Sequence, residues 1–282
     1  MPKKVAVVTG SNKGLGFAIV KALCSKFDGT VYLTSRDEKR GQAACEELRN
    51  QGLAPAFHHL DVTNEESITK FRDYIKEKYQ KIDILVNNAG ILFLKDAKEP
   101  KAFQAEQTIL VNFFALVNFT EAMLPLVRNK GRILNISSSS GHLSRIPSEE
   151  LRKRISSEDL TLDQLKDLMS SYVEAVKLGK EIEDGWGDFP YVVSKVGVNA
   201  YTFMLHRRLN SAEKGITVNC MHPGYVISDM TRGAGSVTPE QGAELALKLL
   251  VEPCESCLYV WHEGTVVPWD GPDPRGYIDG KV

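Results

Sequence analysis

The sequence predicts an α/β fold in which helices cover both faces of a doubly wound, Rossmann-type parallel sheet. Three observations support this prediction. Short apolar segments rich in valine and isoleucine alternate with longer segments of helical periodicity. The apolar segments are almost continuous, as expected of strands that are buried on both faces. A glycine-rich loop joins the first apolar segment to the first helical one, where sheets of this type bind nucleotide phosphates.

The alternation gives the order of the elements. Seven segments are predicted to be strands: 5–9, 31–35, 56–60, 84–87, 132–137, 217–222 and 258–261. The main amphipathic segments between them are predicted to be helices: 17–27, 40–50, 65–79, 106–128 and 191–209. Right-handed crossovers between parallel strands would place these helices on both faces of the sheet.

One segment interrupts the alternation. Residues 141–188 are much longer than a normal connection between a strand and the next helix. Apolar residues recur there at helical spacing, and Thr161-Leu-Asp-Gln164 is typical of a capping box that opens the second of two helices. We therefore expect a single domain over residues 1–282, with a helical insertion at 141–188 that ends in a Gly185-Trp186-Gly187 turn ahead of Tyr191.

Charge and hydropathy argue against several kinds of partner. The 282 residues carry a net charge of -1, which gives no reason to expect a nucleic-acid partner. No apolar run approaches the ~18 residues that span a bilayer. The N-terminus lacks the apolar region of a signal peptide. We therefore expect no membrane partner and a cytoplasmic location.

The five cysteines support the same compartment. An odd and sparse set argues against a disulfide framework and for a reducing environment. Cys254 and Cys257 form a CxxC pair, but a zinc site needs two more ligands and only His262 lies nearby in the sequence. We expect no metal site and interpret the pair as surface-loop cysteines. A metal or redox role is the alternative.

The loop at residues 9–16 has the sequence TGSNKGLG. Its glycines allow a tight turn and let backbone N–H groups approach a pyrophosphate, while the helix N-terminus adds partial positive charge. We therefore predict that a dinucleotide binds here, an ordinary glycine-rich turn being the alternative. The residues predicted to contact it are Gly10, Asn12, Lys13, Gly14, Leu15 and Gly16.

Cations near the end of the second strand indicate which dinucleotide binds. Arg36 lies about 20 residues after the glycine loop, where NAD-preferring enzymes usually carry an acid for the ribose 2′-hydroxyl. Arg40 follows one helical turn later, and Lys13 lies within the loop. Three cations near one ribose favour a 2′-phosphate, so we predict NADPH/NADP+ as the cofactor. The alternative is a solvated charge run in which Asp37 or Glu38 pairs with the arginines.

Tyr191 and Lys195 are four residues apart at the start of a predicted helix and therefore share one face. A lysine cation and a positive nicotinamide both stabilise phenolate, so we expect them to lower the pKa of Tyr191 from its ordinary value near ~10. Tyr191 could then act as a general acid in a reduction. Taken alone, the pair could equally be two surface residues.

Polar residues at neighbouring strand ends give the pair a context. Ser137 to Ser140 follow the fifth strand, where a hydroxyl can donate to a carbonyl oxygen as negative charge develops. Residues 87–90, Asn-Asn-Ala-Gly, end the fourth strand. Asn112 follows in the next helix, where a buried amide needs partners and could hold a water chain to Lys195.

Together these motifs resemble the short-chain dehydrogenase/reductase superfamily over nearly the whole chain. In chain order they are TGxxxGxG at 9–16, Asp61-Val62, NNAG at 87–90, Asn112, Ser138, YxxxK at 191–195 and Pro223-Gly224. Ser35-Arg-Asp, Val111-Asn-Phe-Phe and the long insertion are similar to the animal cytosolic carbonyl reductases that use NADPH.

The resemblance implies roles for individual residues. The implied catalytic tetrad is Asn112, Ser138, Tyr191 and Lys195. The implied cofactor contacts are Asp61 and Val62 beside the adenine, Asn88 under the adenosine ribose with Ala89 and Gly90 next to it, Tyr191, Lys195, and Pro223, Gly224, Val226 and Ser228 at the carboxamide. The insertion covers a surface that many relatives use to oligomerise, which implies a monomer. The chain departs from relatives at Phe189-Pro190, at Ser228 and at residues 280–282, of which the first and the last lie near the substrate mouth.

The function implied by the resemblance is NADPH-dependent reduction of a quinone, aldehyde or ketone, with a hydride from the nicotinamide and a proton from Tyr191. One alternative is a dedicated steroid, prostaglandin or alkaloid dehydrogenase of the same superfamily, because specificity lies in loops such as 91–103 and 225–236. Another is an NADPH-binding protein without turnover, which would have no need of the serine, tyrosine and lysine.

Overall fold

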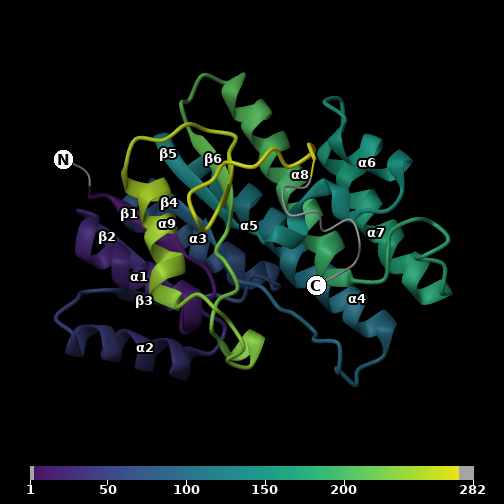
Figure 1. Cartoon of the computed structure of the whole chain (residues 1–282). Coiled ribbons are helices and arrows are strands. Elements are labelled where there is room, and N and C mark those ends of the chain that lie inside the picture. The colour runs from purple at the N-terminus through teal and green to yellow at the C-terminus, as the bar shows by residue number, and fades with distance from the viewer. Residues whose placement is uncertain (1–2, 273–282) are drawn as a thin grey trace.

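A seven-stranded parallel sheet forms the centre of the computed structural model, which describes residues 3–272 (Figure 1). The strands are β1 (Val5–Val8), β2 (Thr30–Ser35), β3 (Ala56–His59), β4 (Ile82–Asn87), β5 (Val127–Ile136), β6 (Thr217–His222) and β7 (Tyr259–Trp261). Their order is β3-β2-β1-β4-β5-β6-β7, and every neighbouring pair is parallel. The order reverses between β1 and β4, and such a switch point opens a crevice at the carboxyl ends of the strands.

Side chains of one strand alternate between two apolar cores. Val5 and Val7 of β1 pack into one cluster of buried residues, whereas Ala6 and Val8 pack into the other. The second cluster is completed by α1 (Gly14–Lys26), α2 (Glu38–Asn50) and α9 (Pro239–Val251). The first is completed by α3 (Glu65–Tyr79), α4 (Lys101–Ile109), α5 (Ala115–Met123) and α8 (Pro190–Asn210). The predicted doubly wound sheet is therefore confirmed.

The prediction differs most from the structure around β5 and at α9. The helix expected at 106–128 starts earlier, at Lys101, and its last residues belong instead to β5, which begins at Val127. Helix α9 was not among the predicted helices. Its start carries a recognisable signal, since Thr238 and Gln241 form a capping box around Pro239.

The predicted helical insertion is confirmed as α6 (Glu149–Ser156) and α7 (Leu162–Leu178). The capping box is present: the backbone N–H of Gln164 donates to Thr161 Oγ1 at 3.2 Å, and that of Thr161 donates to Gln164 Oε1 at 2.9 Å. Helix α7 packs against α4 and α8. In Figure 1 it lies with α6 at the right of the molecule, away from the strands. Because the sheet and the insertion cover α8 from different sides, its apolar residues are not confined to one face.

A long helical run packs into the first of the two apolar cores. It joins α4, a π-helical turn (Leu110–Phe114), α5 and a 3₁₀ turn (Leu124–Leu126). By length and composition, the run Lys101–Leu126 could cross a membrane, although no uninterrupted apolar run of that length is found in the sequence. More than half of its most apolar window is buried within the protein, as is typical of a core helix.

Candidate functional site

A cavity of about 1310 Å³ opens at the carboxyl ends of the central strands. The glycine loop after β1, the turn after β4, the serines after β5 and the segment after β6 all line it. Cavities that hold one ligand usually measure about 300–1000 Å³. The larger volume has room for a dinucleotide together with a second small molecule.

The glycine loop has the backbone geometry that close approach of a phosphate requires. Gly10 and Gly14 adopt left-handed conformations, with φ of 58° and 56°. A Cβ atom on Gly16 would lie 2.4 Å from the side-chain nitrogen of Asn88, so no other residue fits there without displacing Asn88. Helix α1 begins at Gly14, and Lys13 provides no side-chain cap for its N-terminal N–H groups. These groups are free to bind an anion.

Asn88 holds this loop in place. Its Nδ2 donates to the carbonyl oxygens of Thr9 and Gly10 at 2.9 and 3.0 Å. In return, the backbone N–H groups of Asn88 and Ala89 donate to Thr9 Oγ1 at 2.9 and 3.0 Å. The NNAG turn and the TG dipeptide therefore form one hydrogen-bonded unit across β1 and β4. Asn88, Ala89 and Gly90 also line the cavity, as the predicted cofactor contacts require.

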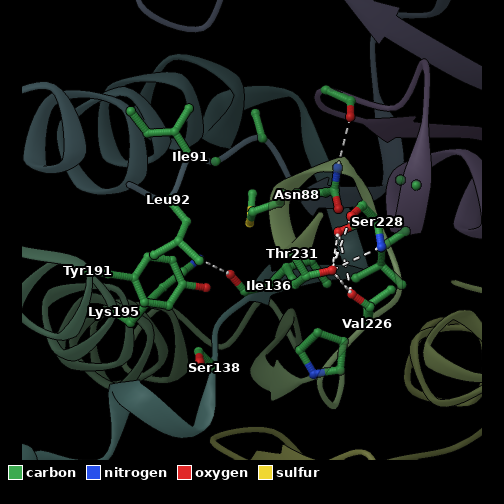
Figure 2. Close-up of a pocket in the computed structure, with 18 of the residues that line it drawn as sticks. Asn88, Ile91, Leu92, Ile136, Ser138, Tyr191, Lys195, Val226, Ser228 and Thr231 are labelled. Carbon is green, nitrogen blue, oxygen red and sulfur yellow. Dashed lines mark hydrogen bonds between the residues drawn. The ribbon is translucent and has the colours of Figure 1, made fainter. Parts of the chain in front are cut away.

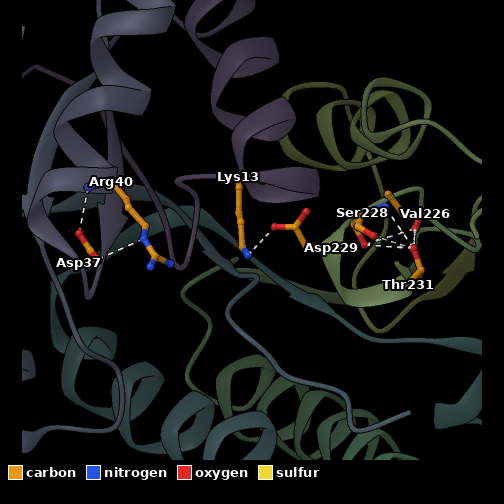
Figure 3. A network of polar contacts seen from close by, with 7 residues as sticks. All are labelled: Lys13, Asp37, Arg40, Val226, Ser228, Asp229 and Thr231. Atoms are coloured by element: carbon orange, nitrogen blue, oxygen red, sulfur yellow. Dashed lines mark hydrogen bonds and ion pairs between the residues drawn. The ribbon is translucent and has the colours of Figure 1, made fainter. Parts of the chain in front are cut away.

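The three cations predicted to read a 2′-phosphate are not equivalent. Arg36 lines the cavity and has no ion-pair partner within residues 3–272. Lys13 also lines it, but its Nζ lies 2.7 Å from Asp229 Oδ2 (Figure 3). Arg40 does not line the cavity. Its Nε pairs with Asp37 at 3.2 Å, and Asp37 also caps α2, so the alternative in which Asp37 pairs with an arginine holds for Arg40.

Ser138, Tyr191 and Lys195 meet on one wall of the cavity (Figure 2). Tyr191 and Lys195 lie on the first turns of α8, with the ammonium 5.5 Å from the centre of the phenol ring. The side chain of Ser138 lies close enough to Tyr191 to oppose the rise in the pKa of the phenol. Among the four serines, Ser137 is buried, and a Cβ on Gly141 would lie only 2.6 Å from its Oγ. Ser138 is therefore better placed than Ser137 to meet a bound carbonyl compound.

Burial governs the ionisation of this pair. It raises the pKa of Tyr191 to about 12, and the neighbouring Ser138 opposes this rise. Burial also lowers the pKa of Lys195 to about 8. In the protein without a bound nicotinamide the pKa of Tyr191 is therefore raised, because desolvation penalises the charged phenolate. The lowering expected from Lys195 together with a positive nicotinamide stays a prediction.

Asn112 lies behind the cavity wall, in the π-helical turn. Its side chain is buried and makes a reciprocal pair with Ile91: the Ile91 N–H donates to Oδ1 at 2.8 Å, and Nδ2 donates to the Ile91 carbonyl at 2.9 Å. Nδ2 also lies 3.1 Å from the hydroxyl of Ser194, which donates to the Tyr191 carbonyl at 2.8 Å. Asn112 thus joins the loop after β4 to the helix that carries Tyr191 and Lys195. π-helical turns within α-helices are frequently found at functional sites.

The remaining predicted contacts also line the cavity: Gly10, Asn12, Leu15, Asp61, Val62, Pro223, Gly224, Val226 and Ser228. The carboxylate of Asp61 is turned towards Thr63, whose N–H and hydroxyl donate to Oδ1 at 2.9 and 2.7 Å. Ser228 starts a tight turn in which its N–H donates to Thr231 Oγ1 at 3.1 Å. This turn holds Ser228 and Val226 together on the cavity wall (Figure 2).

Further lining residues were not among the predicted catalytic and cofactor contacts. They include Leu92, Arg145, His222, Tyr225, Ile227, Met230 and His262. Leu92, Tyr225, Ile227 and Met230 lie in the loops 91–103 and 225–236, which were expected to carry specificity. His222 could have been identified from its position as the last residue of β6. Arg145 and His262 come from segments whose approach to the cavity depends on tertiary packing alone.

The cysteines lie away from this site. All five are free, and Cys254 and Cys257 are half-buried before β7. The sulfur of Cys254 accepts from Arg132 Nη1 at 3.4 Å. Among residues 3–272, no three histidine, cysteine or acidic side chains come together in an arrangement suited to a metal ion.

Comparison with known proteins gives the family. The profile of the short chain dehydrogenase family matches residues 4–148. The chain is 44% identical over 254 residues to carbonyl reductase (NADPH) 3 of Rattus norvegicus, covering 89% of this chain and 91% of that one.

Solved structures agree with this match. Salutaridine reductase from Papaver somniferum superposes with a TM-score of 0.84 and 31% identity, over 91% of this chain and 99% of that one. NADPH-bound carbonyl reductase from chicken fatty liver superposes with a TM-score of 0.68 and 25% identity, over 95% and 99%. With its sheet order, its glycine loop and these relatives, the chain belongs to the short-chain dehydrogenase/reductase family of oxidoreductases.

Proposed function

We propose that the protein uses NADPH to reduce carbonyl compounds, namely quinones, aldehydes and ketones, to alcohols. The observation that carries this proposal is that Ser138, Tyr191 and Lys195 share a cavity with the glycine loop. The relative from Rattus norvegicus, named as an NADPH-dependent carbonyl reductase, supports both the cofactor and the substrate class.

The residues of the cavity suit NADPH. The uncapped N-terminus of α1 and the glycine loop would hold the pyrophosphate, and Arg36 with Lys13 would hold the 2′-phosphate. Asp61 and Val62 would flank the adenine, and the Val226–Ser228 turn would hold the carboxamide. Lys195 would bind the nicotinamide ribose. When bound, NADPH supplies the hydride that the carbonyl carbon accepts.

The protein supplies the proton and the position of the substrate. A pKa of about 12 keeps Tyr191 protonated at neutral pH, so its phenol can donate to the carbonyl oxygen. Ser138 donates a second hydrogen bond to the same oxygen and stabilises its developing negative charge. The oxygen gains the proton of Tyr191 and the carbon gains the hydride, which together give an alcohol and leave Tyr191 as phenolate. Lys195 and water held near Asn112 would then return the proton.

A variant of the proton donor tests this function. Tyr191→Phe should lower kcat with a quinone or an activated ketone at least about a hundredfold while NADPH still binds. Tyr172→Phe is the matched control, because Tyr172 does not line the cavity. Its buried hydroxyl, in the insertion, has no hydrogen-bond partner within the described residues. Undiminished NADPH oxidation by Tyr191→Phe would refute the mechanism. NADPH binding without turnover in the wild type would favour a non-catalytic binding protein.

A dedicated reductase of the same family is the second candidate. The high structural similarity to salutaridine reductase favours it, because that protein is named for a single substrate. The exposed apolar side chains of Tyr225, Ile227 and Met230 at the cavity mouth would contact the body of such a substrate. A panel of quinones, simple aldehydes, steroids, prostaglandins and alkaloid ketones separates the candidates, since a dedicated enzyme would turn over one class with a much higher kcat/KM.

We also propose that the protein is a monomer in the cytoplasm. The packing of α7 on α4 and α8 supports the first part, because the insertion covers one side of these two helices and was expected to cover a surface used for oligomerisation. The free cysteines are consistent with a reducing compartment. Sedimentation of the purified protein would test the oligomeric state, and a dimer or tetramer would refute this part.

A further inference from the structure

A short segment at the cavity mouth is held by two ion pairs. The segment runs from Ser228 to Arg232 and includes the 3₁₀ turn Asp229–Thr231. Asp229 pairs with Lys13 of the glycine loop at 2.7 Å, and Arg232 pairs with Asp96, in the loop after β4, at 2.5 Å. We call residues 228–232 the rim segment. Its two ion pairs therefore lead to two different walls of the cavity.

The glycine loop and the rim segment are close at a second point. A Cβ atom on Gly14 would lie 3.8 Å from the Cβ of Ser228, which is ordinary van der Waals contact. Figure 3 shows the side chain of Lys13 extended towards Asp229. The two segments are therefore neighbours in the fold, apart from the ion pair that joins their side chains.

The ammonium of Lys13, which a 2′-phosphate would need, is already paired with Asp229. Of the three cations expected near the 2′-phosphate, Arg40 is engaged with Asp37 outside the cavity, and Arg36 has no ion-pair partner within residues 3–272. Lys13 is the remaining cation, and its ammonium is already bound to a carboxylate. An anion entering this corner of the cavity must share Lys13 with Asp229 or replace it.

We propose that Asp229 sets the affinity for NADPH by competing with the 2′-phosphate for Lys13, so that cofactor binding breaks the Lys13–Asp229 ion pair and removes one restraint on the rim segment. The inference rests on the proposed use of NADPH and adds a residue that opposes it. The exchange is feasible because both side chains are more than half exposed, and exposed ion pairs contribute little to stability. A phosphate also carries up to two negative charges, against one on Asp229, and accepts more hydrogen bonds.

The exchange would link the two ends of the cofactor site. Asp229 follows Ser228 directly, and Ser228 is the residue expected to hold the carboxamide at the other end of a bound dinucleotide. A rim segment released from Lys13 stays attached through Arg232 and Asp96. Binding of the 2′-phosphate at Lys13 therefore changes how Ser228, the expected carboxamide contact, is held in place.

Binding of three probes to Asp229→Asn tests the proposal without any turnover. The probes are NADPH, NADH and adenosine 2′,5′-bisphosphate, titrated against the full-length protein at low salt by calorimetry or fluorescence. We expect the variant to bind NADPH and the bisphosphate about threefold more tightly or better, with NADH unchanged. The gain should shrink at high salt, because exposed charges are screened.

Two further variants complete the experiment. Asp96→Asn removes the other ion pair of the rim segment and leaves Lys13–Asp229 intact, so NADPH affinity should stay at the wild-type value. Lys13→Met should abolish the effect of Asp229→Asn, because the carboxylate then has no cation to withhold.

Four results would overturn the proposal. They are unchanged or weaker NADPH binding by Asp229→Asn, equal tightening of NADH, an equal gain with Asp96→Asn, and a gain that persists in the Lys13→Met background. Failure of the proposed function gives a different result, since the wild type itself would then bind NADPH no better than NADH.

Discussion

The ammonium of Lys195 donates a hydrogen bond to the backbone carbonyl of Ile136 at 2.8 Å. This bond fixes the side chain against the carboxyl end of β5, two residues before Ser138. The helix that carries Tyr191 and the strand that precedes Ser138 are thereby joined at the site itself. The same burial that fixes Lys195 lowers its pKa to about 8, which has two consequences that can be measured.

The first consequence is a pH dependence of reduction. Lys195 loses its charge as pH rises through about 8, whereas Tyr191, with a pKa of about 12, keeps its proton. We expect kcat/KM for a carbonyl substrate to fall above pH ~8 because of the lysine. Lys195→Met should be slow at all pH values and lack this decline. A wild-type profile that is flat up to pH ~10 would contradict the assignment.

The second consequence concerns stability. The pKa of Lys195 in the folded protein is about 8, below the value of 10.5 for an unperturbed lysine. The unfolded chain therefore binds the proton more tightly, and the penalty of the buried charge is fully present below pH 8 and disappears between pH 8 and 10.5.

The free energy of unfolding of the wild type should rise across this window relative to Lys195→Met. Denaturant titrations at pH 7 and pH 10 measure the difference, and the comparison cancels other titrating groups. A difference between the two proteins that does not change with pH would show that Lys195 is not penalised by burial.

The hydrogen bond between Asn112 and Ser194 predicts a positioning role for Ser194. In Ser194→Ala, Asn112 keeps its pair with Ile91 but loses its link to the helix of Tyr191. We expect kcat to fall about threefold to tenfold, with the Kd for NADPH unchanged and the alkaline limb of the pH profile shifted. Ser171→Ala is the matched control, because Ser171 makes a similar bond to a carbonyl three residues earlier in α7. Equal losses in both variants would indicate a purely structural effect.

The different surroundings of Arg36 and Arg40 predict different roles in cofactor selection. Arg36→Asp should weaken NADPH at least about tenfold and NADH far less, because Arg36 lines the cavity. Arg40→Asp should have a smaller effect, because Arg40 is paired with Asp37 outside the cavity. Steady-state KM values for the two cofactors measure both variants. A larger loss of NADPH selectivity in Arg40→Asp than in Arg36→Asp would show that the start of α2 rearranges when NADPH binds.

Most of the fold could be predicted because its signals are local. Alternating apolar and amphipathic segments indicate the order of the strands, and the capping box of Thr161 and Gln164 marks the start of α7 within four residues of sequence. The start of β5 was missed because Val127 continues the apolar character of the preceding helix. The choice between helix and strand there depends on pairing of Val127 with Ile82 in β4, which is a long-range contact.

The parts of the site that depend on residue spacing within one helix could be predicted. The parts that depend on contacts between distant segments could not. Tyr191 and Lys195 share a helix face, and their position follows from four-residue spacing. The pairing of Lys13 with Asp229 joins residues 216 positions apart, so the sequence offers no sign of it. The raised pKa of Tyr191 in the protein without cofactor was unpredictable for a similar reason, because it results from burial of the phenol, and burial is set by the whole fold.

Asn112 lies in the π-helical turn Leu110–Phe114, so the direction of its side chain depends on the number of residues in that turn as well as on their types. Each residue turns an α-helix by about 100°, so one additional residue in this turn rotates everything after it by about that angle. Deletion of a single residue from the turn would restore regular winding but would misdirect either the amide of Asn112 or the apolar face of α5. The chain can therefore accept many substitutions along this helix more readily than the loss of one position.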